Sequence, residues 1–203
     1  MFSRRFIALA AAAALLAGAA IAAPAALPDD MSLGNPKAKV QVIEYASLSC
    51  PHCAHFNETV FTPFKAKWVD TGKARYTLKE MLTPPQQVAA AGFLMARCAG
   101  PAKYFKVVDE VFRSQTRWEN GKIKPVFLEV AAANGLSEAQ FNACLTDGAA
   151  QDALNARAQR AAQVDGVNST PTLFINGKRI EPLPQSAAEM DAAIAQALKS
   201  GGR

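Results

Sequence analysis

The sequence has few residues of the kinds that bind metal ions. Histidine occurs twice and cysteine four times in 203 residues, and both histidines lie in the stretch 47–56, SLSCPHCAHF. A structural zinc site usually draws its ligands from two separated pairs of cysteine or histidine, and this chain has no second histidine pair. We therefore expect no metal cofactor, although the two cysteines and two histidines of 47–56 leave zinc or copper binding open as an alternative.

A strong excess of charge is lacking as well. The formal net charge is +5, and Arg4 and Arg5 lie in a segment that we expect to be removed, which leaves 20 basic and 17 acidic residues. No basic stripe with interleaved aromatic residues is present, so the sequence predicts no nucleic-acid partner. Half of the residues are hydrophobic, which is enough for a sizeable core in one domain or in one domain with an insertion.

Only one long apolar run occurs, and it lies at the N-terminus. Arg4 and Arg5 precede the Ala- and Leu-rich run 6–20, and Ala-Ile-Ala at 20–22 matches a signal-peptidase site. We predict a signal peptide over 1–22, which implies export to the periplasm by the general or the twin-arginine route. A membrane anchor is the alternative, but the run is shorter than the roughly 20 strongly apolar residues of a spanning helix.

Strand and helix patterns alternate in the first part of the remaining chain. Residues 23–38 are rich in Ala, Pro, Asp and Gly and predict a tether. A β-branched, apolar run predicts a strand over 40–46. Apolar residues at helical spacing predict a helix over 53–68, kinked at Pro63 because proline lacks a backbone donor. A second strand is predicted over 75–81.

Residues 86–165 contain no convincing strand and predict helices only. Pro125 suits the first position of one helix, where a missing N–H group costs nothing. Ser137 and Gln140 form a capping box that opens another helix, which we expect to end at Gly148.

Strand patterns return after this helical block. A strand is predicted over 172–175, and Asn176-Gly177 predicts a hairpin to a return strand over 178–180. A last helix should begin at Ser186. The order β-α-β, helices, β-β-α predicts an α/β fold with an inserted all-helical subdomain. The predicted division is a first half over 39–85, the insertion over 86–165 and a second half over 166–203.

Cys50 lies where the first strand gives way to the helix. With Cys50 as N-cap and Pro51 in the first helical position, the sulfur faces free N–H groups and the positive end of the helix dipole. His52 adds a positive or polarisable neighbour, so we expect Cys50 to be an exposed thiol with a lowered pKa. Cys53 lies one turn deeper, where it can resolve a mixed disulfide. A structural disulfide closing so small a loop would constrain almost nothing, so the spacing favours redox chemistry.

This stretch resembles the active site of the DsbA family of thioredoxin-fold thiol oxidoreductases, in which Pro-His typically separates the cysteines. A second motif supports the resemblance, because Thr170-Pro171 leads into the strand at 172–175. The matching proline of thioredoxin-like folds has a cis peptide bond and faces the two cysteines. The resemblance covers roughly 34–197 and implies a thioredoxin fold, with Thr170 and Pro171 lining an apolar substrate groove.

Glu44 is a carboxylate in a strand of apolar residues. It shares a face with Val40 and Val42, so its pKa should be raised. It also precedes Cys50 by six residues, and the resemblance implies a buried acid that handles the proton of the second cysteine. Lys79 is the expected partner. The alternative is an ordinary glutamate on an edge strand.

The two remaining cysteines are distant in the sequence. Cys98 and Cys144 are expected to form a structural disulfide between two helices, because an exported chain favours disulfides over thiols. Two buried free thiols are the alternative. His55 is expected to face solvent, and Trp68 and Trp118 are expected to be packing residues.

The sequence therefore predicts a thiol:disulfide oxidoreductase of the DsbA type that introduces disulfide bonds into exported proteins. No dissociable cofactor is expected. The expected partners are unfolded, reduced exported proteins and a membrane reoxidant of the DsbB type. A monomer is expected, because the segment before the first strand is too short for a dimerisation domain. A disulfide isomerase or reductase of the same fold is one alternative, and a metal-binding or holdase module is another.

Overall fold

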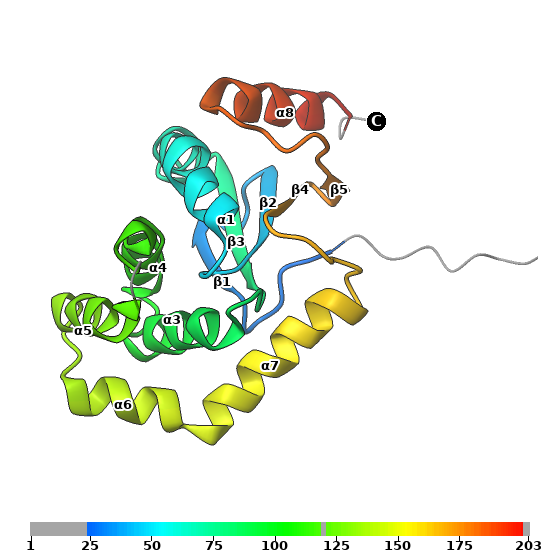
Figure 1. Ribbon diagram of the computed structural model, residues 1–203. Helices are drawn as coiled ribbons and strands as arrows, with labels where there is room; N and C mark the ends of the chain where they lie inside the picture. The colour runs from blue at the N-terminus through cyan, green and yellow to red at the C-terminus, as the bar shows by residue number, and fades with distance from the viewer. Residues whose placement is uncertain (1–23, 119–120, 201–203) are drawn as a thin grey trace, which may run out of the picture.

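The fold is built on a central five-stranded sheet with the strand order β1-β3-β2-β4-β5 (Figure 1). A computed structural model describes residues 24–118 and 121–200, so the predicted signal peptide lies outside the described residues. β2 and β3 are parallel, and the other neighbours are antiparallel. The strands are β1 Met31–Gly34, β2 Val40–Ala46, β3 Ala74–Glu80, β4 Thr172–Ile175 and β5 Lys178–Arg179.

The strand β1 contradicts the tether expected over 23–38 at residues 31–34. Met31–Gly34 pairs antiparallel with β3 at the edge of the sheet. Gly34 ends this strand with a φ of +86°, and a Cβ atom there would lie 2.3 Å from the carbonyl oxygen of Ala74. A four-residue edge strand has too short an apolar pattern to be recognised, and its pairing with β3 is what orders it.

One continuous helical segment follows β2 and runs from Pro51 to Val69. Its parts are α1 Pro51–Phe56, the π-helix η1 Asn57–Phe61, α2 Thr62–Phe64 and the π-helix η2 Lys65–Val69. The predicted interruption at Pro63 therefore takes the form of wider turns on either side of the proline, in which hydrogen bonds span five residues. The backbone N–H of Thr62, for example, donates to the carbonyl oxygen of Asn57.

In the described part of the chain between β3 and β4, five α-helices form a block beside the sheet (Figure 1). The capping box at Ser137 and Gln140 is present as predicted. Pro125 is the third residue of its helix rather than the first, which still leaves it in the first turn, where N–H groups have no helical partner. The helices are α3 Gln86–Cys98, α4 Tyr104–Arg113, α5 Ile123–Ala133, α6 Glu138–Thr146 and α7 Gly148–Gln163.

The C-terminal elements agree with the sequence patterns. Ile175 pairs with Lys178 across the turn Asn176-Gly177, whose two residues have the positive φ angles of a type I′ hairpin. The helix α8, Ala187–Ser200, follows Ser186, whose hydroxyl accepts a hydrogen bond from the Glu189 backbone N–H at 3.2 Å. The predicted α/β fold with inserted helices is thus confirmed.

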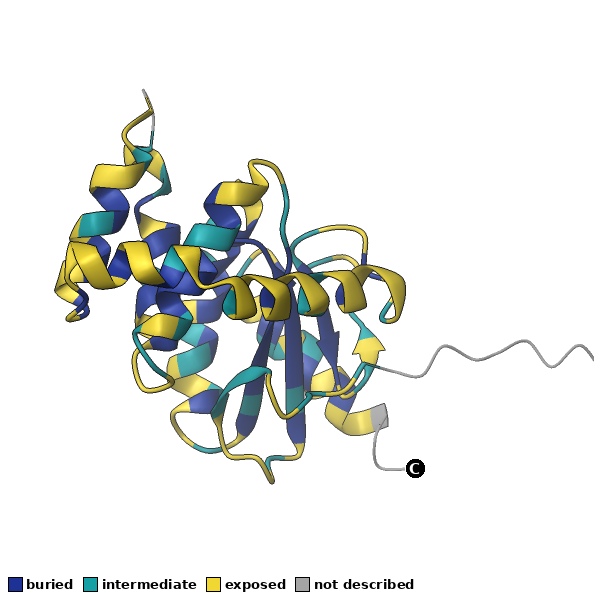
Figure 2. Cartoon of the chain, turned by 90° about the horizontal axis from the view of Figure 1, so that it is seen from below, coloured by how far each residue is buried: buried dark blue, intermediate teal, exposed yellow. Residues whose placement is uncertain are grey.

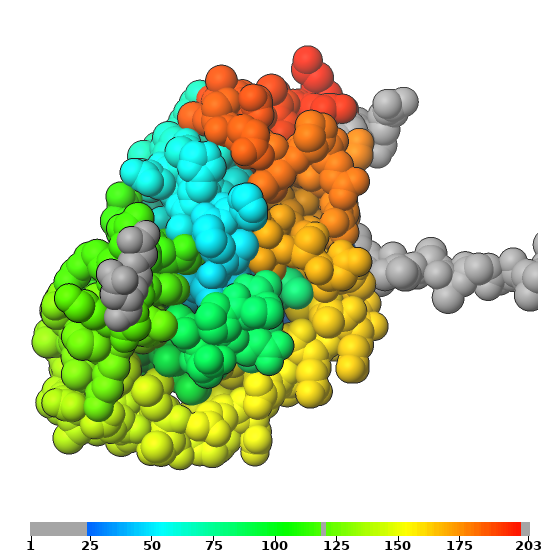
Figure 3. Space-filling view, viewed as in Figure 1, coloured from blue at the N-terminus to red at the C-terminus, as the bar shows by residue number. Residues whose placement is uncertain are grey.

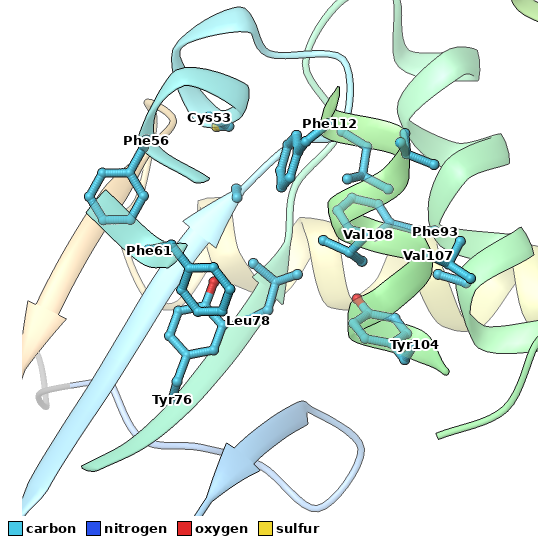
Figure 4. Packing of buried hydrophobic residues seen from close by; sticks show 14 of the residues in the cluster. Cys53, Phe56, Phe61, Tyr76, Leu78, Phe93, Tyr104, Val107, Val108 and Phe112 are labelled. Atoms are coloured by element: carbon cyan, nitrogen blue, oxygen red, sulfur yellow. The ribbon is translucent and has the colours of Figure 1, made fainter. Parts of the chain in front are cut away.

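The core has a large and a small part, one on each face of the sheet. The large part joins β2 and β3 to the segment Pro51–Val69, to α8 and to the helical block, and Figure 4 shows its aromatic centre. The small part consists of Ile43, Tyr45, Met81, Ala161, Val167 and Phe174. The three inner strands β2, β3 and β4 are almost entirely buried (Figure 2), so a charged side chain buried on one of them must be paired or neutral. Among the described residues, no helix is long and apolar enough to span a membrane.

Candidate active site

Cys50 occupies the N-cap of α1, as predicted from its local sequence. Its backbone is extended, with φ −86° and ψ 118°, and Pro51 is the first helical residue. The backbone N–H groups of Cys53 and Ala54 donate to the carbonyl oxygen of Cys50 at 3.1 and 3.2 Å. The sulfur therefore lies at the amino end of a helix, where unpaired N–H groups and the helix dipole favour a negative charge.

The Cys50 thiol is more enclosed than we expected. Only 7% of the residue is exposed, because its Sγ lies 3.5 Å from the carbonyl oxygen of Thr170. From the helical block, the Gln115 side-chain amide donates to the carbonyl oxygens of Leu48 and Cys50 at 2.9 and 3.3 Å. Gln115 is thus a residue of the site that the sequence did not reveal, since it lies 65 positions from Cys50 and in no recognisable motif.

Several hydrogen bonds lower the pKa of Cys50 to about 5. The largest contribution comes from the Cys53 thiol, followed by the Thr170 side chain and the backbone N–H groups of Cys53 and His52, while burial opposes them. The His52 side chain is exposed. The structure therefore assigns the stabilisation by His52 to its backbone N–H, whereas the sequence predicted that the imidazole would provide it.

Cys53 differs from Cys50 in that its pKa is raised rather than lowered. It is fully buried, and burial raises its pKa far above the ordinary value. Its hydrogen bond to Cys50 and the negative charges of Glu44 and Cys50 raise it further. At neutral pH the reduced pair thus consists of one thiolate and one thiol.

Glu44 lies on β2, the middle strand of the sheet, so the edge-strand alternative is wrong. Its side chain is buried and accepts a hydrogen bond from the Tyr76 hydroxyl at 2.7 Å. Burial raises the pKa of Glu44 to about 7, although the Tyr76 hydrogen bond lowers it and the charge on Cys50 raises it. This carboxyl group can therefore gain or lose a proton near neutral pH.

Lys79 is not the partner of Glu44, contrary to our expectation. Its Nζ atom lies 3.5 Å from Asp30 and 3.2 Å from Asp165, on the other face of the sheet. The register pairs Glu44 with Leu78 and Tyr45 with Lys79. Because successive side chains of a strand point to opposite faces, Lys79 shares a face with Tyr45 rather than with Glu44.

Thr170 and Pro171 lie beside the cysteines, and their peptide bond is cis, as the resemblance implied. Next to them is a groove of about 230 Å³ between α1 and the segment around β4. In Figure 3 the cyan surface of α1 meets the orange surface of the C-terminal segment in this region. The groove is lined by Phe56, Val60, Pro171, Leu183 and Pro184, and by His52, His55, Thr59, Thr170 and Gln185. It is less apolar than predicted, and His55 is exposed as expected.

The other predicted residues lie away from this groove. Cys98 of α3 and Cys144 of α6 form a disulfide with a Cα–Cα distance of 6.1 Å, so the free-thiol alternative is wrong. Trp68 and Trp118 are both partly buried and packed against the core. Within 24–118 and 121–200, no three histidine, cysteine or acidic side chains converge as metal ligands would.

The sheet, the cysteine pair at a helix start and the cis-proline beside it define a thioredoxin-fold protein with a redox-type cysteine pair. The sequence profile of the family described as thioredoxin matches residues 26–196, and the chain belongs to this family. A relative from Rickettsia bellii, provisionally named a protein-disulfide oxidoreductase, is 30% identical over 170 residues. That match covers 82% of this chain and 65% of the relative, so the chain spans just under two thirds of the relative's length.

DsbA proteins are also similar to the chain, which confirms the resemblance inferred from its motifs. The thiol:disulfide interchange protein DsbA of Yersinia pestis is 29% identical, and the match covers 68% of this chain and 66% of that protein. The crystal structure of Wolbachia pipientis alpha-DsbA1 superposes with a TM-score of 0.78 and 26% identity. The superposition covers 86% of this chain and 94% of the Wolbachia chain.

Proposed function

We propose that this protein is a thiol:disulfide oxidoreductase that introduces disulfide bonds into exported proteins through the Cys50–Cys53 pair. The observation that carries this proposal is the contrast between the two thiols. The pKa of Cys50 is lowered to about 5, whereas burial raises that of Cys53 far above its ordinary range. Stabilising a thiolate favours the reduced pair over the disulfide, so the disulfide form readily accepts electrons.

The exchange begins when a substrate thiolate attacks Cys50 Sγ in the oxidised protein. The new bond joins the substrate sulfur to Cys50, and the Cys50–Cys53 bond breaks with its electron pair passing to Cys53. A second substrate thiolate then attacks the substrate sulfur of this mixed disulfide and releases Cys50 as a thiolate. The substrate is oxidised to a disulfide, and the Cys50–Cys53 pair gains two electrons.

Glu44 is the proposed proton donor in the first step. The leaving Cys53 is buried, so a thiolate there is strongly unfavourable and must be protonated. Burial raises the pKa of Glu44, so a substantial fraction of the molecules hold a proton on this carboxyl group near neutral pH. Transfer of that proton leaves Cys53 as a thiol and Glu44 as a carboxylate, and reoxidation of the pair reverses the transfer.

The substrates we propose are unfolded, reduced exported proteins. The groove beside Thr170 and Pro171 lies next to the Cys50 sulfur and offers both apolar and hydrogen-bonding side chains, as an extended chain segment requires. The names of the relatives, a protein-disulfide oxidoreductase and a thiol:disulfide interchange protein, support a disulfide activity. The predicted signal peptide over 1–22 supports a periplasmic location, and a membrane oxidase of the DsbB type is the proposed reoxidant.

Equilibration with glutathione tests this function and shows whether the protein oxidises or reduces its substrates. We expect the Cys50–Cys53 couple to have a reduction potential above roughly −180 mV, the value typical of protein disulfide isomerase. The oxidised protein should also convert a reduced two-cysteine peptide to its disulfide form in stoichiometric amounts. A potential near that of thioredoxin, about −270 mV, would favour the reductase alternative and overturn the proposed direction.

Replacing His52 separates the effects of its backbone and its side chain. His52→Pro removes the N–H that stabilises the Cys50 thiolate, whereas His52→Ala keeps it. We expect His52→Pro to raise the pKa of Cys50 by about one unit and to lower the reduction potential by about 30 mV. His52→Ala should change both quantities much less. Equal changes in the two variants would show that the imidazole is the stabilising group, as the sequence alone suggested.

A further inference from the structure

Tyr76 makes the hydrogen bond that holds Glu44 in the core. Its hydroxyl donates to Glu44 Oε2 at 2.7 Å, and both side chains are buried. Tyr76 lies on β3 opposite Val42, two positions before the Leu78 that pairs with Glu44. Side chains with this diagonal relation on neighbouring strands are within reach of one another when one of them is aromatic.

The Tyr76 ring is packed by three other aromatic rings. Phe61 lies 4.5 Å away between ring centroids, Phe105 lies 5.9 Å away and Phe64 lies 6.3 Å away. Figure 4 shows Tyr76 and Phe61 side by side on the side of the core that also contains Cys53. Because the ring is confined by its neighbours, the direction of its hydroxyl is also confined.

A second buried glutamate on the same face of the sheet has a different environment. Glu80 accepts hydrogen bonds from the Tyr104 hydroxyl at 2.8 Å, from Arg97 at 2.7 Å and from Arg157 at 2.6 Å. Glu80 therefore forms ion pairs with two arginine side chains. Among the described residues, the Glu44 carboxyl group has the neutral Tyr76 hydroxyl as its hydrogen-bond donor, so its protonation is sensitive to that one bond.

The other titratable groups near Glu44 come from the helix and from the sheet. Cys50 and Cys53 face it from the start of α1, and each interacts electrostatically with the Glu44 charge. Tyr104 of α4 acts on Tyr76 rather than directly on Glu44. Lys79 faces the opposite side of the sheet, and β4 presents Leu173 beside Glu44. Among the described residues, no cation therefore takes the place of the Tyr76 hydroxyl as the group that stabilises the Glu44 carboxylate.

We propose that Tyr76 is a positioning residue for thiol–disulfide exchange, whose hydroxyl holds Glu44 in the orientation and charge state that exchange a proton with the buried Cys53 thiol. This inference rests on the proposed function. The hydroxyl stabilises the carboxylate over the carboxylic acid, so it sets the pH at which Glu44 can accept the proton of Cys53.

The test is the rate at which Cys53 displaces glutathione from Cys50 in the mixed disulfide, followed against pH. In the wild type this rate should rise as Glu44 ionises, with a midpoint at or below pH 7 because Cys50 carries no charge in the mixed disulfide. In Tyr76→Phe the rise should move upward by one to two pH units, since a hydrogen bond to a charged group contributes roughly that much. At pH 7 the rate should fall about tenfold. Tyr104→Phe removes the same group beside Glu80 and should leave the midpoint unchanged.

A tyrosine analogue provides a change of opposite sign without loss of the ring. With 3-fluorotyrosine at position 76 the phenol is a stronger donor, so the midpoint should move to lower pH. The infrared carbonyl stretch of protonated Glu44, assigned by its loss in Glu44→Gln, should titrate in parallel in every variant. This readout needs no thiol exchange and remains available if the chemistry differs from our proposal.

The outcomes separate the two proposals. A wild type that forms no mixed disulfide with glutathione would overturn the proposed function. A wild type that does exchange thiols, but whose midpoint and infrared titration are unmoved by Tyr76→Phe and by 3-fluorotyrosine, would overturn the role of Tyr76. If Tyr76→Phe is too unstable to study, the protein with 3-fluorotyrosine at position 76 alone tests the role of Tyr76. A purely structural role predicts no shift of the pH midpoint in that protein.

Discussion

The reduced protein should gain about 2 to 3 kcal/mol of stability relative to the oxidised protein between pH 4.5 and pH 7.5. Folding lowers the pKa of Cys50 from 9.0 to about 5. A group with a lowered pKa stabilises the fold fully above its unfolded pKa, and this stabilisation is lost as the pH falls through its folded pKa. Most of the gain therefore accumulates between pH 5 and 7.5, and the oxidised form has no Cys50 thiol that can contribute it.

Urea unfolding of both redox forms at the two pH values would measure this difference. Burial raises the pKa of Glu44 to about 7, so its ionisation destabilises the fold as the pH rises. That effect is present in both forms and largely cancels in the comparison. Cys50→Ser provides the matched control, because it lacks the thiolate and should lose the extra pH dependence. A stability gap that does not change with pH would contradict the lowered pKa of Cys50.

Replacing both Cys98 and Cys144 by alanine should lower the free energy of unfolding by about 4 kcal/mol. Their disulfide joins α3 to α6 and closes a loop with a sequence separation of 46 residues. The closed loop restricts the unfolded chain, and in the chain-entropy account the size of this effect follows from the loop length. Urea unfolding of the oxidised proteins, with Cys50 and Cys53 left intact, would measure the loss.

The same disulfide should stay closed while the Cys50–Cys53 pair is reduced. The stabilised Cys50 thiolate favours reduction of its own pair. Cys98 is the last residue of α3 and Cys144 lies near the end of α6, so neither sulfur is at the start of a helix. Alkylation after mild reduction, followed by mass spectrometry, should label Cys50 and Cys53 only. Equal labelling of all four cysteines would show that the second disulfide is as easily reduced as the first.

Local sequence was sufficient for the features that depend on neighbouring residues. Cys50 followed by Pro51 predicts a helix start, because the cap and the first-turn proline act within a few residues. The capping box at Ser137 and the hairpin turn at Asn176-Gly177 are local for the same reason. The motif around Thr170 and Pro171 needed the family resemblance, since its cis peptide bond cannot be derived from spacing.

Features that join distant parts of the chain were decided by the tertiary structure. The burial of Glu44 could be predicted from its strand, but its partner depended on the register between β2 and β3. That register placed Tyr76 on the same face of the sheet as Glu44, and Lys79 on the opposite face. The enclosure of Cys50 by Thr170 and Gln115 required segments 120 and 65 residues away. A single sequence encodes the alternation of side chains along each strand, whereas the partners across strands and helices are determined only when the core packs.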